Sequence, residues 1–170
     1  MNRSGSLALI VVALLAVGVV PREQALAQQP LKQQIVGAWA IVSTDTIRPD
    51  GTRVPTFGPG PKGMVVFDAS GRYALQLARS RATPFASNNR LEGTAEENKA
   101  IVQGSLSHFG RYSVDEASHT LTLHIENSSF PNWNGTDQRR VFTISGDELK
   151  WTTPAASGGG SAELVWKRAK

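Results

Sequence analysis

Apolar and polar residues alternate with a two-residue period along most of the chain after residue 34. The alternation is clearest at residues 120–126, where Leu121, Leu123 and Ile125 share one face and polar side chains occupy the other. Because successive side chains of a β-strand point to opposite sides, this period predicts strands with one buried face. The predicted strands are residues 35–47, 63–68, 72–78, 106–114, 120–126, 138–144, 149–153 and 162–167.

The first and last of these strands are both strongly apolar. The first carries a Gly-x-Trp at Gly37 and Trp39, and the last contains Leu164-Val165-Trp166. Closure into a barrel is the arrangement that leaves neither strand with an unpaired edge. We therefore predict an all-β fold, a single closed antiparallel up-and-down β-barrel of about 8–10 strands, in which the first and last strands pair.

One short helix interrupts the strands. Thr94 and Glu97 have the spacing of a capping box, so a helix should begin there, run to about Gln103 and end at Gly104. The segment has few apolar residues, which favours a lid or plug against the barrel over a core element. Gly110 lies inside a predicted strand and indicates a bend or bulge. Residues 28–34 are interpreted as a polar lead-in.

The N-terminus has the pattern of a signal peptide. Residues 7–20 form an unbroken apolar run, and Ala25-Leu26-Ala27 supplies small residues for cleavage after Ala27. We predict a signal peptide over residues 1–27 and one domain over residues 28–170, exported to the periplasm or secreted, with no membrane association after cleavage. The alternative is an uncleaved N-terminal anchor.

Composition narrows the function classes. The net charge of +4 is mild, and the basic residues are scattered without the basic and aromatic interleaving of nucleic-acid binders, so no nucleic-acid partner is expected. The chain has no Cys and three His, one of them in a predicted turn, and it lacks a Gly-x-Ser-x-Gly elbow. Neither a metal site nor a cofactor is predicted.

Several motifs, taken in order, resemble those of the bacterial and fungal lipocalin-like domain family of calycin-type barrels. The resemblance covers residues 35–168, and its most specific part is a Pro-Asn-Trp-Asn-Gly-Thr block in register with a Gly-Arg-Tyr hairpin. It implies a barrel with a ligand cavity, and it matches Gly37-x-Trp39 to a closing cation, Arg168 or Lys167, stacked over the indole. The motifs are Val36-Gly37-Ala38-Trp39, Asp50-Gly51, Pro59 to Gly63, Gly71 to Leu77, Glu96-Glu97, Gly110 to Asp115, His124 to Ser128, Phe130 to Thr136 and Leu164 to Arg168.

Physical chemistry supports a structural role for this Trp39 and Arg168 pair. A buried indole removes on the order of 200 Å² from water, and a guanidinium over its face contributes about 0.5–2 kcal/mol. Such a pair would tie the first strand to the last and plug one end of the barrel.

Five residues are candidates for ligand binding. Tyr73 and Tyr112 each combine an apolar body with a hydroxyl, and Trp133 is expected to pack over a barrel mouth, where it could gate entry. Arg139 and Arg140 are adjacent, so one faces inward; Arg140 inside would meet an anionic ligand or a partner. His124 lies on the polar face of its strand with Glu126, and could face a ligand or the solvent. Their alternatives are ordinary core tyrosines and a surface ion pair.

Three hypotheses for function follow. The first is an exported protein that binds a small, mostly apolar molecule in the barrel cavity. The second is a cofactor-free isomerase or cyclase, in which His124 or a tyrosine moves a proton. The third is an envelope protein with a filled barrel and no ligand; enzymatic activity is therefore left open, as is the oligomeric state.

Overall fold

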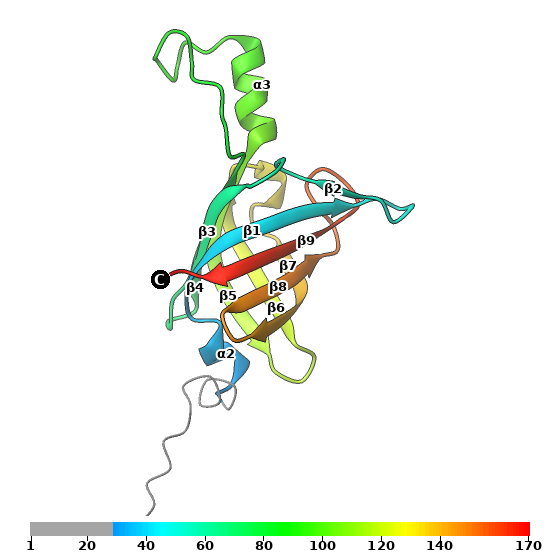
Figure 1. The fold of residues 1–170 in the computed structure, drawn as a ribbon. Coiled ribbons are helices and arrows are strands. Elements are labelled where there is room, and N and C mark those ends of the chain that lie inside the picture. Colours follow the sequence, from blue (N-terminus) through cyan, green and yellow to red (C-terminus); the bar gives the residue numbers. More distant parts are fainter. Residues whose placement is uncertain (1–28) are drawn as a thin grey trace, which may run out of the picture.

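The computed structural model describes residues 29–170, so the predicted signal peptide and the cleavage site after Ala27 lie outside the described residues. Nine strands form one antiparallel sheet in the order β2-β1-β3-β4-β5-β6-β7-β8-β9, and β1 also pairs with β9 (Figure 1). Eight strands thus close into a barrel, which confirms the predicted fold class, and β2 extends one edge. The strands are β1 (Gly37–Ile47), β2 (Arg53–Pro55), β3 (Lys62–Phe67), β4 (Arg72–Ala78), β5 (Ser105–Asp115), β6 (Thr120–Ser128), β7 (Asp137–Ser145), β8 (Glu148–Thr153) and β9 (Ser161–Arg168).

The first and last strands of the barrel lie side by side, as the sequence predicted. Trp39 on β1 is directly opposite Arg168 on β9, and the pairing continues to Ile47 and Ser161. A β-bulge interrupts it between Ile41 and Ser43. The simple two-residue period across this strand is therefore broken, and the buried position moves to Thr44.

One end of the barrel is closed by short turns and a one-turn helix. Residues 28–34 were interpreted as a lead-in, but α2 (Leu31–Gln34) forms there, and Ile35 after it is fully buried. The backbone amides of Leu31 and Lys32 both donate to the carboxylate of Glu116 at 2.8 Å. A carboxylate from the β5–β6 turn therefore satisfies the free amides that begin this helix.

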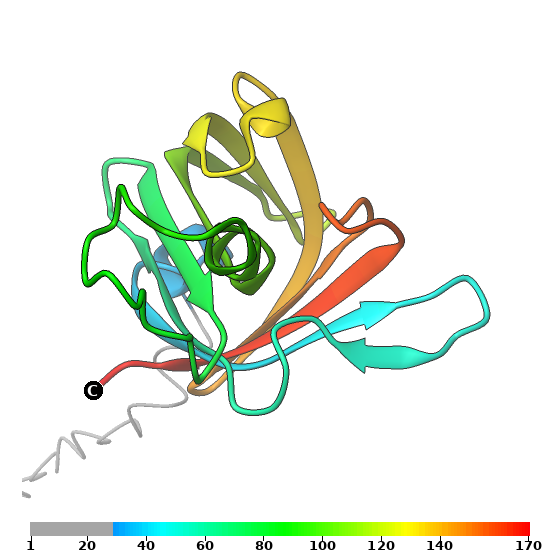
Figure 2. The ribbon, with the colours of Figure 1, turned by 90° about the horizontal axis from the view of Figure 1, so that it is seen from above.

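The other end carries the long connections. They include α3 (Ala95–Gly104) and the 3₁₀ helix η1 (Pro131–Trp133). The predicted capping box is confirmed, since Glu97 donates its amide to the Thr94 hydroxyl and its carboxylate accepts from the Thr94 amide. The expectation of a lid or plug is wrong: α3 stands out from the open end (Figures 1 and 2). Its apolar residues Ile101 and Val102 stay exposed, since they are too few to form a face that packs on the barrel.

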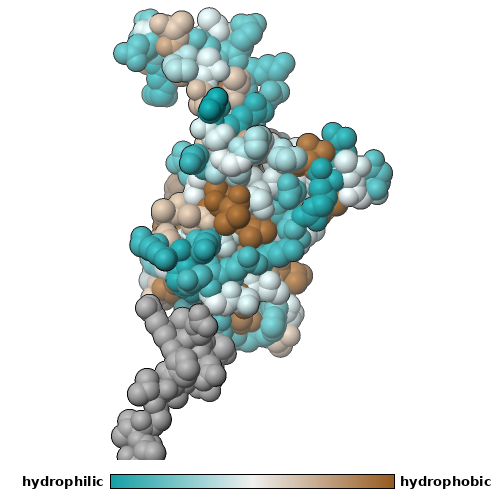
Figure 3. Space-filling view, in the orientation of Figure 1, coloured by the Kyte–Doolittle hydropathy of each residue, from teal (hydrophilic) through white to brown (hydrophobic). Residues whose placement is uncertain are grey.

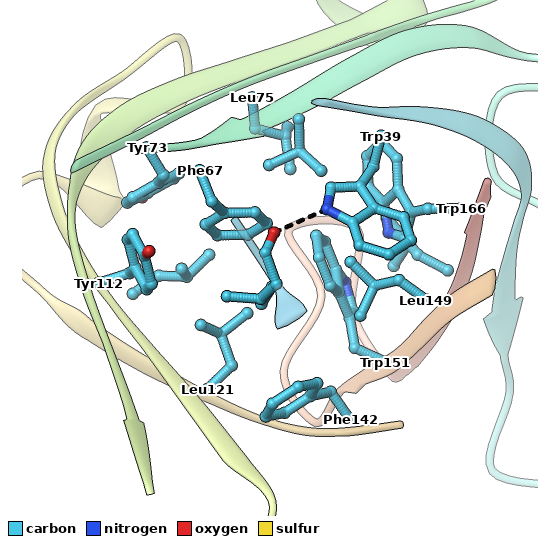
Figure 4. Close-up of a cluster of buried hydrophobic side chains, with 14 of the residues drawn as sticks. Trp39, Phe67, Tyr73, Leu75, Tyr112, Leu121, Phe142, Leu149, Trp151 and Trp166 are labelled. Carbon is cyan, nitrogen blue, oxygen red and sulfur yellow. Dashed lines mark hydrogen bonds between the residues drawn. The ribbon is translucent and has the colours of Figure 1, made fainter. Parts of the chain in front are cut away.

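Aromatic side chains fill much of the interior of the barrel. Trp39, Trp151 and Trp166 are essentially inaccessible, together with Phe67 and Phe142 (Figure 4). The Trp39 indole Nε1 donates to the Ile35 carbonyl at 2.8 Å, which connects the core to the segment after α2. The predicted bulge at Gly110 is also confirmed, because the register of β5 against β6 shifts between Phe109 and Gly110. A Cβ at Gly110 would lie 2.0 Å from the His124 carbonyl oxygen, so only glycine fits there. On the outer surface, apolar side chains such as Val42 and Met64 stand among polar ones (Figure 3).

Arg168 stacks on Trp39 as the sequence predicted. Its guanidinium carbon lies 4.1 Å from the centre of the indole. Its Nη1 and Nη2 donate to the carbonyls of Val36 and Gln34 at 3.1 and 2.8 Å. Gly37 adopts φ +121°, and a Cβ there would lie 3.3 Å from Arg168 Nη1. The glycine of Gly-x-Trp thus provides both the backbone conformation and the room for the arginine.

Candidate ligand-binding site at the open end of the barrel

A depression of about 730 Å³ occupies the open end of the barrel. Its wall comes from four separate segments: the β1–β2 hairpin, the end of α3, the residues after β6 and the loop between β8 and β9. Apolar side chains are well represented in the lining, among them Val54, Phe57, Leu106 and Phe130. Figure 2 shows these segments around the opening, and their side chains make the depression partly apolar.

A smaller pocket of about 50 Å³ lies next to the depression, inside the barrel. The two spaces share Thr56, Phe57, Leu106 and Ser157 in their linings, so they adjoin. Besides aliphatic side chains, the lining of the inner pocket contains aromatic and polar ones: His108, Trp133, Arg140, Trp151 and Thr153. Beneath them the aromatic core closes the barrel, so most of the free space lies at the mouth.

Arg140 is the charged group of this inner pocket. Its residue is 3% exposed, its Nε donates to the Thr153 hydroxyl at 3.1 Å, and its Nη2 donates to the Gln138 side-chain carbonyl at 2.7 Å. Its Nη1 is buried and has no hydrogen-bond partner. Burial lowers the pKa of Arg140 to about 10, and the guanidinium is therefore still charged at neutral pH.

Tyr73 and His108 form a buried pair beside Arg140. The Tyr73 hydroxyl and His108 Nδ1 are 2.9 Å apart, and both residues are almost inaccessible. Burial, and then the charge of Arg140, lower the pKa of His108 to about 3. Burial also raises the pKa of Tyr73. At neutral pH both side chains are therefore uncharged, and the pair does not neutralise Arg140.

Tryptophans complete the surroundings of Arg140. Trp151 lies 5.9 Å from its guanidinium carbon, and the indole nitrogens of Trp151 and Trp166 are buried without a hydrogen-bond partner. Trp133, on η1, lies edge-on to His108 and to Phe130, with ring centres 5.9 and 5.5 Å apart. Buried indole N–H groups usually find an acceptor, so the indole nitrogens of Trp151 and Trp166 are further unused donors.

The linings of the two spaces contain two arginines, Arg48 and Arg140, and no carboxylate among the described residues. None of the ion pairs found within residues 29–170 includes Arg140. The positive charge inside the barrel is therefore balanced by no acidic side chain there.

Of the five candidates from sequence, three meet at this site and two do not. Arg140 and Trp133 line the inner pocket, and Tyr73 lies outside its lining but bonds to His108, which is part of it. Tyr112 lies near the closed end, where its hydroxyl donates to the Asp68 carbonyl at 2.7 Å and its ring packs edge-on to Phe67.

His124 corrects the expectation of an inward role. Its side chain is 41% exposed on the outer face, and its Nδ1 lies 2.6 Å from Asp137 Oδ1. Glu126 is also outside and pairs with Arg72 and Arg111. The physical reason is that Leu121, Leu123 and Ile125 occupy the inner face, so the alternate residues point to solvent. The proton-transfer hypothesis loses the histidine on which it relied.

Sequence reasoning missed His108 and Trp151. The two-residue period of the strands could have identified both. It places His108 on the same strand face as Tyr112, and Trp151 on the same face as Leu149 and Thr153. Within residues 29–170 no cluster of three or more metal-ligating side chains is found, and no helix is long and apolar enough to cross a membrane.

Comparison with known protein families identifies the family of the chain. The lipocalin-like domain family matches residues 36–169, and the chain belongs to this family. A relative from Aspergillus oryzae (strain ATCC 42149 / RIB 40), named 4'-hydroxy-3'-methoxypropiophenone carrier protein ppsC, is 39% identical over 86 residues, which cover 47% of this chain and 78% of the relative. A mutant of the fluorescent protein UnaG is similar at a TM-score of 0.38 with 12% identity, over 81% of this chain and 97% of that one.

Proposed function

We propose that this protein is an exported binding protein for a small, mostly apolar molecule that occupies the open end of the barrel. The observation that carries the proposal is the partly apolar depression that adjoins an inner pocket with unused polar groups. Binding sites for small molecules commonly combine a largely apolar wall with a few convergent polar groups that fix orientation. The family supports a binding role.

The relative from Aspergillus oryzae supports a particular size and chemistry of ligand. Its name describes a carrier for an aryl ketone with one hydroxyl and one methoxy group. An aromatic ring with oxygen substituents suits a site that has aromatic walls and hydrogen-bond donors. We therefore propose that a small oxygen-bearing aromatic or similarly apolar compound is carried.

Native mass spectrometry tests the proposal directly. The protein is purified from its own periplasm or culture medium without denaturation, and its mass is compared before and after mild heating or solvent extraction. The expected result is the mass of a chain that begins at Gln28, together with an adduct of a few hundred daltons that extraction removes. An intact N-terminus would overturn the proposed cleavage.

Binding of a neutral fluorescent probe tests the site itself. N-phenyl-1-naphthylamine, an uncharged apolar amine, should gain fluorescence on binding, and 4'-hydroxy-3'-methoxypropiophenone should displace it. Trp133→Ala removes the half-buried indole at the rim and should weaken binding and change the association rate. Unchanged affinity and rate in Trp133→Ala would end the proposed gate. Absence of any probe binding would count against the binding function.

A further inference from the structure

We infer that the ligand of this site carries one ionised oxygen acid, and that this negative group lies against Arg140 while the apolar body of the ligand occupies the depression. The inference rests on the proposed function, because it specifies the ligand of the same site. It follows from three features: the unpaired charge, the donor character of the unused hydrogen-bonding groups and the sizes of the two spaces.

The first feature is a buried charge without a counter-charge. Burying an isolated ion costs much free energy, and buried arginines are normally paired with carboxylates or phosphates. Arg140 donates only to the neutral Gln138 and Thr153 side chains, and its Nη1 has no partner. An anion at Nη1 would provide both the missing charge and the missing acceptor.

The second feature is that the unused groups are all donors. Within residues 29–170, the side-chain atoms buried without partners are Arg140 Nη1, Arg168 Nε and the indole nitrogens of Trp151 and Trp166. Of these, Arg140 and Trp151 line the inner pocket. A site that offers N–H groups and no carboxylate selects a ligand that accepts hydrogen bonds. It disfavours protonated amines, whose positive charge would face that of Arg140.

The third feature is the match between volume and chemistry. One water molecule needs roughly 10–15 Å³ by the same measure of volume, so the inner pocket holds about three to five waters. That is enough for an acidic head group, whereas the adjoining depression of about 730 Å³ takes the rest of a small molecule. The arrangement therefore orients the ligand head inward. Arg48 on the rim of the depression would attract the same negative charge during entry.

A pair of matched fluorescent probes tests the inference. 8-Anilinonaphthalene-1-sulfonate has the aromatic body of N-phenyl-1-naphthylamine with an added sulfonate, so the ratio of their dissociation constants isolates the contribution of the negative group. The full chain, with any co-purified ligand extracted, is titrated with each probe. We expect the sulfonate to bind at least about tenfold more tightly, since one ion pair with good geometry is worth that much.

Arg140→Met assigns the preference to Arg140. The variant removes the charge while it keeps a long side chain, and we expect the dissociation constant of the sulfonate to rise about 30-fold or more. The dissociation constant of the neutral probe should stay within about threefold. Arg139→Met is the matched control, because Arg139 is the adjacent residue on the exposed face of β7 and should leave both constants unchanged.

The outcomes separate the inference from the proposed function. Equal binding of both probes by the wild-type protein would overturn the inference and leave the binding function intact, and it needs no variant. Equal weakening of both probes in a folded Arg140→Met protein would also overturn it, because Arg140 would then act only by shaping the pocket. If Arg140→Met does not fold, the wild-type ratio alone decides: a ratio near one contradicts the inference, and a ratio of about ten or more supports it.

Discussion

The barrel holds two arginine–tryptophan pairs, one toward each end, and they differ in the partners of the arginine. Each arginine has one buried nitrogen without a hydrogen bond, but among the described residues only Arg168 has a carboxylate nearby, that of Asp147. At the closed end the Arg168 carbon lies 4.1 Å from the Trp39 ring, and two of its nitrogens donate to main-chain carbonyls. Toward the open end the Arg140 carbon lies 5.9 Å from the Trp151 ring, and one of its terminal nitrogens has no partner.

This difference separates a structural arginine from one available to a ligand. Arg168 completes the hydrogen bonding of the carbonyls of Gln34 and Val36 after α2, and Asp147 lies 3.8 Å from its Nε. Arg140 is more deeply buried, yet it donates a hydrogen bond to no main-chain carbonyl; its partners are the side chains of Gln138 and Thr153. The residue type and the aromatic neighbour are thus poor guides to whether an arginine is structural or binds a ligand. The groups with which its nitrogens pair are a better guide.

The largest expected effect comes from Arg168→Met. The variant removes the cation–π contact and leaves the carbonyls of Gln34 and Val36 without their donor, so we expect a loss of about 2–4 kcal/mol in the free energy of unfolding. Urea unfolding measures it. Lys167→Met, at the exposed neighbouring position, should change the same quantity by less than about 0.5 kcal/mol. A loss of similar size in both variants would show that the closing pair has no special role.

The next effect concerns His108, the neutral imidazole beside Arg140. Its pKa in the folded protein is about 3, below the 6.5 of an unperturbed histidine, so the unfolded chain binds a proton between these values and the folded protein does not. Above pH 6.5 His108 is neutral in both states and does not change the free energy of unfolding. As the pH falls from 6.5 toward 3, the unfolded state gains the proton first, so His108 destabilises the fold increasingly. Between pH 7 and pH 4 we expect about 2–3 kcal/mol of the acid destabilisation to come from this residue.

His108→Asn measures this contribution. The pH dependence of its urea unfolding should be shallower than that of the wild-type protein between pH 7 and pH 4, after the carboxylates common to both are taken into account. His124→Asn serves as the control, because that imidazole lies on the outer face with Asp137, away from Tyr73, Arg140 and Trp133. If the slope is the same for His108→Asn and for the wild type, the imidazole is not held neutral.

The architecture was predictable because strand formation and closure depend on local pattern. The two-residue alternation at residues 120–126 and the apolar first and last strands carry that information directly in the sequence. The capping box at Thr94 is equally local. The direction of α3 was not predictable, because it depends on whether a weakly apolar helix finds a surface to cover, which no nearby residue determines.

The candidate site was predictable only in part. Alternation implied that one of Arg139 and Arg140 faces inward, yet which one depends on the register of β7 against β6, where Arg140 is opposite the buried Leu121. Trp133 could be placed at a mouth from its loop. Both orientations of His124 stayed open, although the apolar face formed by Leu121, Leu123 and Ile125 already indicated the solvent side. His108 was overlooked although its strand period puts it inside.

A smaller effect is expected from Gly37→Ala. The new Cβ would lie 3.3 Å from Arg168 Nη1, and the backbone at φ +121° is unfavourable for alanine. We expect a loss of about 2 kcal/mol in the free energy of unfolding. Gly51→Ala is a matched control, because φ is +82° there and nothing lies within 4 Å of the added Cβ. The difference between the two variants measures crowding of Arg168, and equal losses would mean that backbone conformation alone explains the glycine.

The smallest effect on stability is expected where the charge is most deeply buried. Arg140→Met removes a buried cation that has no anionic partner, and replacement of such a charge by an apolar side chain of similar length is often neutral or stabilising. We therefore expect the free energy of unfolding of the ligand-free protein to change by less than about 1 kcal/mol, or to rise. Urea unfolding of Arg140→Met, with Arg139→Met as the control variant, measures this change in the free energy of unfolding. A loss as large as that in Arg168→Met would mean that the two arginines do the same structural work, which would remove the distinction between the two ends of the barrel.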